Sequence, residues 1–150
     1  MKITHQNDRC MQLELARVLL VDDNPTSRLT LQTVLEASGY HVDSAASAAE
    51  AIPMLDAKEY ELVLSDLQME SPEAGLKVLA HARIMDYKPA TAIVTTYQNA
   101  KDQKDQHAKS AQARMLITPE DIPGLLGKVA NLISQRAARR VQREMRHATS

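Results

Sequence analysis

Short apolar runs alternate with longer amphipathic stretches along most of this chain, and the alternation predicts its secondary structure. Runs of four or five apolar, often β-branched residues are typical of strands buried on both faces of a parallel sheet. Apolar residues spaced three or four apart are typical of helices that pack one face against such a sheet. The predicted strands cover residues 17–21, 41–46, 61–65, 90–95 and 113–117.

Capping and breaking residues place helices between these strands. Asn24-Pro25 offers a cap followed by proline, and Ser38-Gly39 ends the same helix with a glycine cap. Ser47 caps a second helix, which Pro53 should keep short or bent. The predicted helices run from Pro25 to Ser38, over 48–57, after Gly75, over the polar stretch 99–110, and from Pro119 onward.

Five strands that alternate with helices predict an α/β fold, a doubly wound parallel sheet with helices on both faces. The chain has 150 residues, of which 44% are hydrophobic, enough for one domain with its own core. We expect a flexible leader at 1–15, a globular body at 16–134 and a basic helical extension at 135–150.

Three acidic residues stand where two predicted strands end. Asp22 and Asp23 directly follow the first strand, and Asp66 follows the third. The carboxyl ends of parallel strands form the edge where open α/β sheets bind ligands. Carboxylates that converge there repel one another unless a cation joins them, and Mg²⁺ prefers such oxygen ligands. The pattern predicts a Mg²⁺ site at which Asp66 could act as a nucleophile toward phosphorus.

Three segments carry a pattern that belongs to a known family: VLLVDDNP at 18–25, LVLSDLQM at 62–69 and IVTT at 93–96. In this order and spacing they resemble the receiver domain of two-component response regulators, over roughly residues 16–134. The resemblance implies a flavodoxin-like fold with five parallel strands in the order 2-1-3-4-5 and five helices, the last one extended here.

The resemblance also implies roles for individual residues. Asp66 would be the phosphoacceptor, and Asp22, Asp23, Asp66 and the backbone carbonyl of Gln68 would hold Mg²⁺. Thr95 would follow the phosphoryl group at the end of the fourth strand. The phosphoryl donor would be a histidine kinase or a histidine phosphotransfer protein. The output would pass to a downstream protein partner, in two-component phosphorelay signal transduction.

The chain departs from the family pattern at three positions. Thr118 stands where receivers usually have the lysine that contacts the acyl phosphate, Met115 replaces an aromatic residue, and Glu70 replaces a proline. The missing ammonium removes a charge-assisted contact worth about 1.5–3 kcal/mol, for which Thr118 could supply only one weaker hydrogen bond. The favoured role of Thr118 is to cap a helix before Pro119, and a phosphate contact is secondary. Two functions therefore stay open: a phosphorylated switch, or a degenerate receiver that binds proteins independently of phosphorylation.

Other classes of function are disfavoured. Phosphatases with a carboxylate nucleophile generally need a second acid two residues later, where this chain has Gln68, so we expect no enzyme activity on an external ester. The chain has no Phe or Trp to stack on single-stranded nucleic acid. It has one cysteine, Cys10, and no membrane-spanning or signal-peptide pattern, so we expect a cytoplasmic protein without membrane contact.

Charge is distributed unevenly. Residues 1–135 hold 13 Lys and Arg against 18 Asp and Glu, whereas 136–150 hold five Arg and one Glu. This basic segment could be an extended helix whose arginines balance its dipole, a homodimer or partner helix, or, less favoured, a contact to nucleic acid or another acidic surface. The apolar stripe predicted for the last helix comprises Ile122, Leu126, Val129, Ile133 and Ala137, continued by Val141 and Met145.

Overall fold

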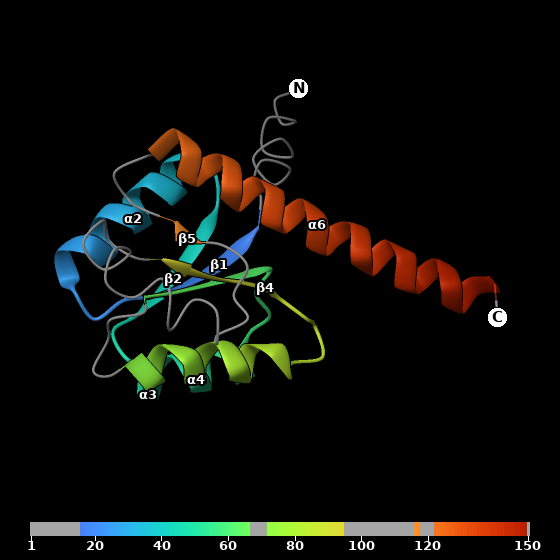
Figure 1. Cartoon of the computed structure of the whole chain (residues 1–150), viewed down its shortest axis with the longest axis horizontal. Coiled ribbons are helices and arrows are strands. Elements are labelled where there is room, and N and C mark those ends of the chain that lie inside the picture. The colour runs from blue at the N-terminus through green and yellow to red at the C-terminus, as the bar shows by residue number, and fades with distance from the viewer. Residues whose placement is uncertain (1–15, 67–71, 95–115, 118–121, 150) are drawn as a thin grey trace, which may run out of the picture.

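The computed structural model describes residues 16–66, 72–94, 116–117 and 122–149 (Figure 1). The predicted helix at 99–110 lies outside these residues. The strands are β1 (Arg17–Val21), β2 (His41–Ala45), β3 (Leu62–Asp66), β4 (Ala90–Val94) and β5 (Leu116–Ile117). The helices are α2 (Pro25–Ala37), α3 (Ala48–Ala57), α4 (Pro72–Arg83) and α6 (Ile122–Thr149).

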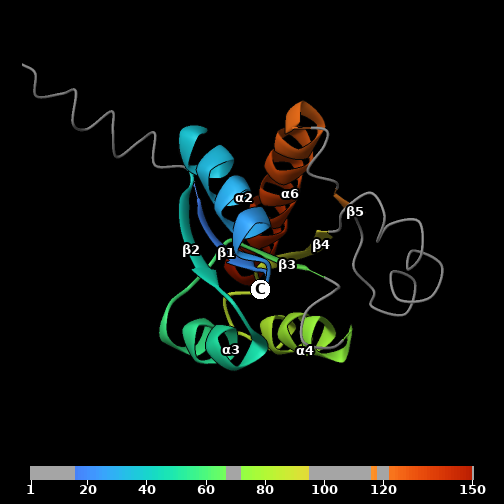
Figure 2. The ribbon, with the colours of Figure 1, turned by 90° about the vertical axis from the view of Figure 1, so that its left-hand side faces the viewer.

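The five strands form one parallel sheet in the order β2-β1-β3-β4-β5. Helices α2 and α6 cover one face, and α3 and α4 cover the other (Figures 1 and 2). The predicted doubly wound sheet and its strand order are therefore confirmed.

Each face of the sheet has its own core because side chains alternate along every strand. In β1, Val18 and Leu20 pack toward α2 and α6, while Leu19 and Val21 pack toward α3 and α4. All four are fully buried. A strand that is apolar on both faces is stable only where helices cover both, which is why the short apolar runs identify the sheet so well.

The caps of the first two helices are the predicted ones. The side chain of Asn24 accepts hydrogen bonds from the backbone N–H of Thr26 at 2.9 Å and of Ser27 at 3.1 Å. Gly39 follows α2 with φ at 103°, a backbone conformation that glycine adopts without strain. Ser47 accepts a hydrogen bond from the N–H of Glu50 at the start of α3.

Helix α4 begins three residues before Gly75, so the prediction that this helix follows the glycine was wrong. Pro72 occupies the first helical position, where its fixed φ suits a helix, and Glu73 complements the helix dipole in the first turn. Gly75 lies inside the helix for another reason. A Cβ at this position would be 2.5 Å from the backbone oxygen of Asp66, so the glycine lets α4 approach the end of β3.

The buried face of α6 is rotated from the predicted stripe, which was wrong for several positions. Ile122 is 38% exposed, Ala137 is exposed, and Leu126 and Ile133 are only partly buried. The residues of α6 that are buried are Leu125, Val129, Leu132 and Arg136. The C-terminal part of α6 projects away from the body, as the prediction of an extended last helix requires (Figure 1). After Arg136, residues 137–142 are all exposed.

Arg136 fixes α6 to the connection between α4 and β4. Its Nε donates to the carbonyl of Lys88 at 2.9 Å, and its Nη2 donates to the carbonyl of Tyr87 at 2.6 Å. The side chain is only 6% exposed, and this burial lowers the pKa of the guanidinium. The sequence interpretation placed Arg136 in the basic extension and did not anticipate its burial, because an arginine breaks the apolar stripe.

Tyr60 forms a second buried polar contact, which connects the start of β3 to β2. The ring is fully buried, and its hydroxyl donates to Asp43 at 2.8 Å. Burial and the nearby Asp43 carboxylate raise the pKa of Tyr60. Burial alone would raise the pKa of Asp43, but hydrogen bonds from Tyr60 and Lys58 outweigh it and lower that pKa.

We expect Tyr60→Phe to lower the free energy of unfolding by about 1 kcal/mol near neutral pH, because Asp43 loses its closest donor, the Tyr60 hydroxyl, and keeps only the longer contact with Lys58 at 3.4 Å. An acid with a depressed pKa contributes stability above its unfolded pKa and loses it as pH falls through the folded pKa. The difference from wild type should therefore shrink in urea titrations below about pH 4. Tyr87→Phe, which removes a hydroxyl bonded to the carbonyl of Leu55, is the control and should show no such acid dependence. A pH-independent deficit in Tyr60→Phe would contradict this account.

Candidate phosphoryl and metal site

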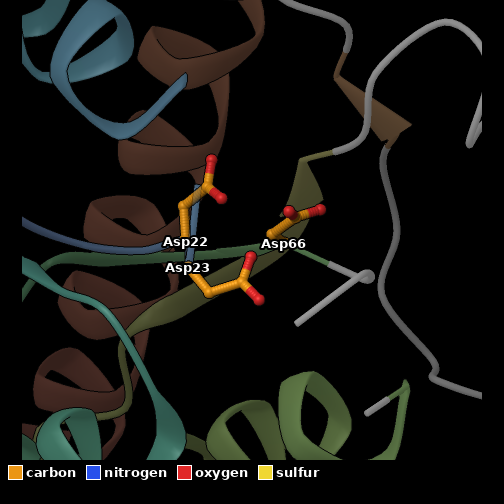
Figure 3. Close-up of side chains that lie close together, drawn as sticks. All are labelled: Asp22, Asp23 and Asp66. Atoms are coloured by element: carbon orange, nitrogen blue, oxygen red, sulfur yellow. The ribbon is translucent and has the colours of Figure 1, made fainter. Parts of the chain in front are cut away.

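The three predicted acids lie together at the carboxyl edge of the sheet. Strands β1 and β3 are neighbours, with Val21 in register with Ser65, so Asp22 and Asp66 follow at adjacent strand ends. One carboxylate oxygen from each of Asp22, Asp23 and Asp66 lies within 4.8 Å of the others. Figure 3 shows that the three side chains lie close together at the strand ends. The structure thus brings together the acids that the sequence singled out.

Exposure distinguishes the three acids. Asp22 is 3% exposed and Asp66 is 8% exposed, whereas Asp23 faces solvent. Asp22 and Asp66 form the buried part of the site. Asp23 lies on the side that is open to water or to an incoming group. This arrangement suits an ion that keeps part of its hydration shell, as Mg²⁺ does.

Backbone contacts hold Asp22 in place. Its N–H donates to the carbonyl of Ala45 at 3.1 Å, and its Oδ1 accepts from the N–H of Asn24 at 2.9 Å. Arg28, one turn into α2, donates from Nη1 to the backbone carbonyl of Asp22 at 2.6 Å. The guanidinium therefore secures the peptide of Asp22 and leaves its carboxylate directed toward the other acids.

The electrostatics of the cluster favour a bound cation. Burial raises the pKa of Asp22, and the negative charge of Asp23 raises it further. The hydrogen bond from Asn24, an interaction with Asp66 and the charge of Arg28 oppose this rise without cancelling it. A carboxylate whose ionised form is disfavoured in this way gains most from a divalent cation placed among the oxygens. The all-oxygen donor set therefore fits Mg²⁺.

Gly75 and Ser65 contact the backbone of Asp66, the candidate phosphoacceptor. The sequence did not predict these contacts. Gly75 allows α4 to pack against the backbone carbonyl of Asp66, and the Ser65 hydroxyl lies 3.5 Å from the same oxygen. A glycine inside a helical pattern was the available signal, because such a residue often marks a close approach. Ser65 offered no signal beyond being a polar residue within an apolar strand.

Several predicted site residues lie outside the described residues, and their roles remain predictions. They include Thr95, which follows the last residue of β4 in sequence. Asp66 and Val94 are partners in the register of β3 and β4, so the end of β4 is beside the acid cluster. The others are Gln68, Glu70, Met115 and Thr118.

A parallel five-stranded sheet in this order, with three acids at the ends of β1 and β3, defines a receiver-like protein. The family described as "Response regulator receiver domain" matches residues 18–130. The chain belongs to this family of response regulator receiver domains.

Relatives in sequence are regulators and kinases that are much longer than this chain. The chain is 35% identical over 103 residues to the alginate biosynthesis transcriptional regulatory protein AlgB of Pseudomonas putida, covering 69% of the chain and 22% of AlgB. It is 33% identical over 81 residues to the hybrid signal transduction histidine kinase F of Dictyostelium discoideum, covering 52% of the chain and 7% of the kinase. The chain thus spans about a fifth or less of the length of these relatives.

Solved structures confirm the fold. The response regulator TrrA of Thermotoga maritima, in complex with Mg(2+)-BeF, is 27% identical with a TM-score of 0.64, covering 77% of this chain and 97% of TrrA. A CheY-like receiver domain from Methanospirillum hungatei is 24% identical with a TM-score of 0.70, covering 83% of this chain and 98% of its own, and supports the fold alone. Among the described residues, no helix has the length and apolar character needed to cross a membrane.

Proposed function

We propose that this receiver domain accepts a phosphoryl group on Asp66 in a Mg²⁺-dependent reaction and signals through protein contacts in the cytoplasm. The observation that carries the proposal is the convergence of Asp22, Asp23 and Asp66 within 4.8 Å at the edge of the sheet. Membership of the receiver family supports it, as does the likeness to TrrA, whose structure holds Mg(2+)-BeF.

In the proposed reaction a carboxylate oxygen of Asp66 attacks phosphorus on a phosphohistidine donor. A new bond joins oxygen to phosphorus, the bond from phosphorus to the histidine nitrogen breaks, and its electron pair stays on the imidazole. Asp22 and Asp23 would hold Mg²⁺, which when bound would supply positive charge to offset the charge on the transferred group. The donor is a histidine kinase or a histidine phosphotransfer protein. In this proposal the phosphoryl group stays on Asp66 and no external phosphate ester is turned over, so the domain is not proposed as an enzyme.

Asp66→Asn is expected to abolish phosphoryl uptake. The test incubates the whole chain with acetyl phosphate and Mg²⁺ and follows the intact mass, which should rise by one phosphate in the wild type only. Asp86→Asn, at an exposed acid in the connection after α4, is the matched control and should behave as wild type. A phosphate increment that persists in Asp66→Asn, or none in the wild type, would refute the proposal.

A second candidate is a receiver that binds its partner without phosphorylation. Thr118, Met115 and Glu70, at positions where the family pattern has other residues, favour it. Under this alternative Asp66→Asn leaves the affinity for a downstream partner unchanged, whereas a phosphorylation switch predicts a large loss. Thr118→Lys gives a complementary test, since it should improve phosphorylation or switching only if the missing ammonium limits them.

A further inference from the structure

A pocket of about 380 Å³ lies between the end of α4, the start of β4 and α6. It is at the edge of the sheet opposite the acid cluster. Strand β4 begins at Ala90, in the wall of the pocket, and ends at Val94, the register partner of Asp66. A molecule bound in this pocket would therefore not contact the proposed phosphoryl site.

Two arginines from different elements line the pocket. Arg83 lies in the last turn of α4, and Arg139 lies on α6. Among the described residues of the lining none is acidic, whereas Asp56, Glu59 and Asp86 line the groove between the ends of α3 and α4. Within the described part of the chain, Arg139 forms no ion pair. Two guanidinium groups that share a pocket repel each other, and an anion bound between them relieves that repulsion.

Packing and hydrogen bonds hold the apolar wall of the pocket in place. Pro89 and Leu132 form this wall, and both are buried. Arg136 fixes the chain directly before Pro89, because it donates to the carbonyl of Tyr87 at 2.6 Å and to that of Lys88 at 2.9 Å. The pocket is therefore largely formed before a ligand arrives, as sites for small molecules usually are.

The chemistry of the lining favours a phosphate monoester. Guanidinium groups bind phosphate oxygens through paired N–H bonds, and the side chains of Thr91 and Gln135 in the lining can donate further hydrogen bonds. A phosphate monoester carries a charge of about −1.5 to −2 at pH 7, which matches two arginines. A carboxylate or a phosphodiester carries a single negative charge and matches them less well. The apolar wall suits the organic part of an ester.

We propose that this pocket binds a small organic phosphate monoester, with its phosphoryl oxygens between Arg83 and Arg139. The organic group lies against Pro89 and Leu132. Because the two arginines belong to α4 and α6, the bound ester holds these helices together. It is bound without a covalent bond and without Mg²⁺, unlike the phosphoryl group proposed for Asp66.

Phenyl phosphate is the probe, since it joins a phosphate monoester to an apolar ring. Amide NMR of the full chain follows the titration, with a chelator in place of Mg²⁺ so that phosphorylation of Asp66 does not contribute. The backbone N–H signals of Thr91 and Leu132 should shift in a saturable way. A titration without saturable shifts at these residues would overturn the proposal and leave the phosphorylation of Asp66 untouched.

Substitution of the arginines tests the pocket itself. Arg139→Gln should weaken the binding of phenyl phosphate about tenfold or more, because a charge-assisted contact is lost. Arg140→Gln removes the same charge from the next residue of α6, which pairs with Glu144 at 3.7 Å and does not line the pocket. This control should bind nearly as tightly as the wild type. Equal weakening by the two variants would indicate general attraction to a basic helix and contradict the proposal.

Arg83→Gln should weaken binding to a similar extent as Arg139→Gln, and circular dichroism checks that its helices remain. Unchanged binding in a folded Arg83→Gln variant would contradict the placement of the phosphoryl group between two arginines.

Two further probes test the class of ligand. Phenyl sulfate has nearly the same shape as phenyl phosphate but a single negative charge, so it should bind several-fold more weakly at neutral pH. Equal affinity would overturn the assignment of a phosphate monoester. A single-stranded oligonucleotide without a terminal phosphate should not displace phenyl phosphate. Displacement by the oligonucleotide would assign the pocket to nucleic acid instead and contradict the proposal.

Discussion

Gly75→Ala is expected to lower the free energy of unfolding by about 1–3 kcal/mol and to slow phosphoryl uptake by Asp66. The added Cβ would lie 2.5 Å from the backbone oxygen of Asp66, which is too close for any real contact. That oxygen belongs to the main chain and cannot swing away as a flexible side chain would. Either α4 or the end of β3 must shift, and a shift of β3 displaces the proposed nucleophile from Asp22 and Asp23.

Gly127→Ala is the matched control. Gly127 is an exposed residue of α6, and a Cβ built there would have no neighbouring atom within 4 Å. Alanine favours a helix over glycine, so this variant should raise the free energy of unfolding by about 0.5–1 kcal/mol. Urea denaturation of both variants measures the comparison. Equal stabilisation by the two substitutions would show that α4 does not need the close approach to Asp66.

Mg²⁺ is expected to raise the free energy of unfolding by about 2.7 kcal/mol at a concentration 100 times its dissociation constant, provided that only the folded chain binds it. The physical reason is that Asp22, Asp23 and Asp66 lie close together, so a cation among them relieves the repulsion between their charges. Burial and the charge of Asp23 already raise the pKa of Asp22. Thermal unfolding with and without Mg²⁺, at matched ionic strength, measures the effect.

Asp22→Asn separates repulsion within the site from metal binding. The amide oxygen can still accept the hydrogen bond from the N–H of Asn24, so the local backbone should be preserved. Without Mg²⁺ the variant should be at least as stable as the wild type, because a buried charge is gone. Mg²⁺ should raise the free energy of unfolding of this variant much less than that of the wild type. A variant that loses stability without the ion and responds to it normally would contradict the proposed metal site.

The fold and the place of the site could be predicted because both depend on local patterns. The runs that begin at Val18 and Leu62 are short, and their apolar side chains point to both faces of the strand. This pattern indicates a strand that is buried on both faces of a parallel sheet. Because parallel strands end at one edge, acids that follow them in sequence must meet in space. No long-range contact had to be known to bring Asp22 and Asp66 together.

The features that could not be predicted depend on contacts between distant residues. Arg136 is buried only because the carbonyls of Tyr87 and Lys88 face it, and these lie about 50 positions earlier in the chain. Arg136 is buried because the face of α6 that packs against the body differs from the predicted stripe. The apolar pattern predicted a helix that follows Gly75, whereas the place of this glycine inside α4 depends on how closely the helix approaches Asp66. In both cases a polar or small residue contacts main-chain oxygens, and the pattern of hydrophobic residues does not show where those oxygens lie.

Binding of beryllofluoride, a stable mimic of a phosphoryl group, tests most directly whether Asp66 is a Mg²⁺-dependent phosphoryl acceptor. Fluorine NMR of the full chain should show a bound signal when Mg²⁺ is present and none when a chelator removes it. The bound signal should be absent from Asp66→Asn and present in Asp86→Asn. A wild type that gives no bound signal, or a bound signal that survives Asp66→Asn, would contradict the account.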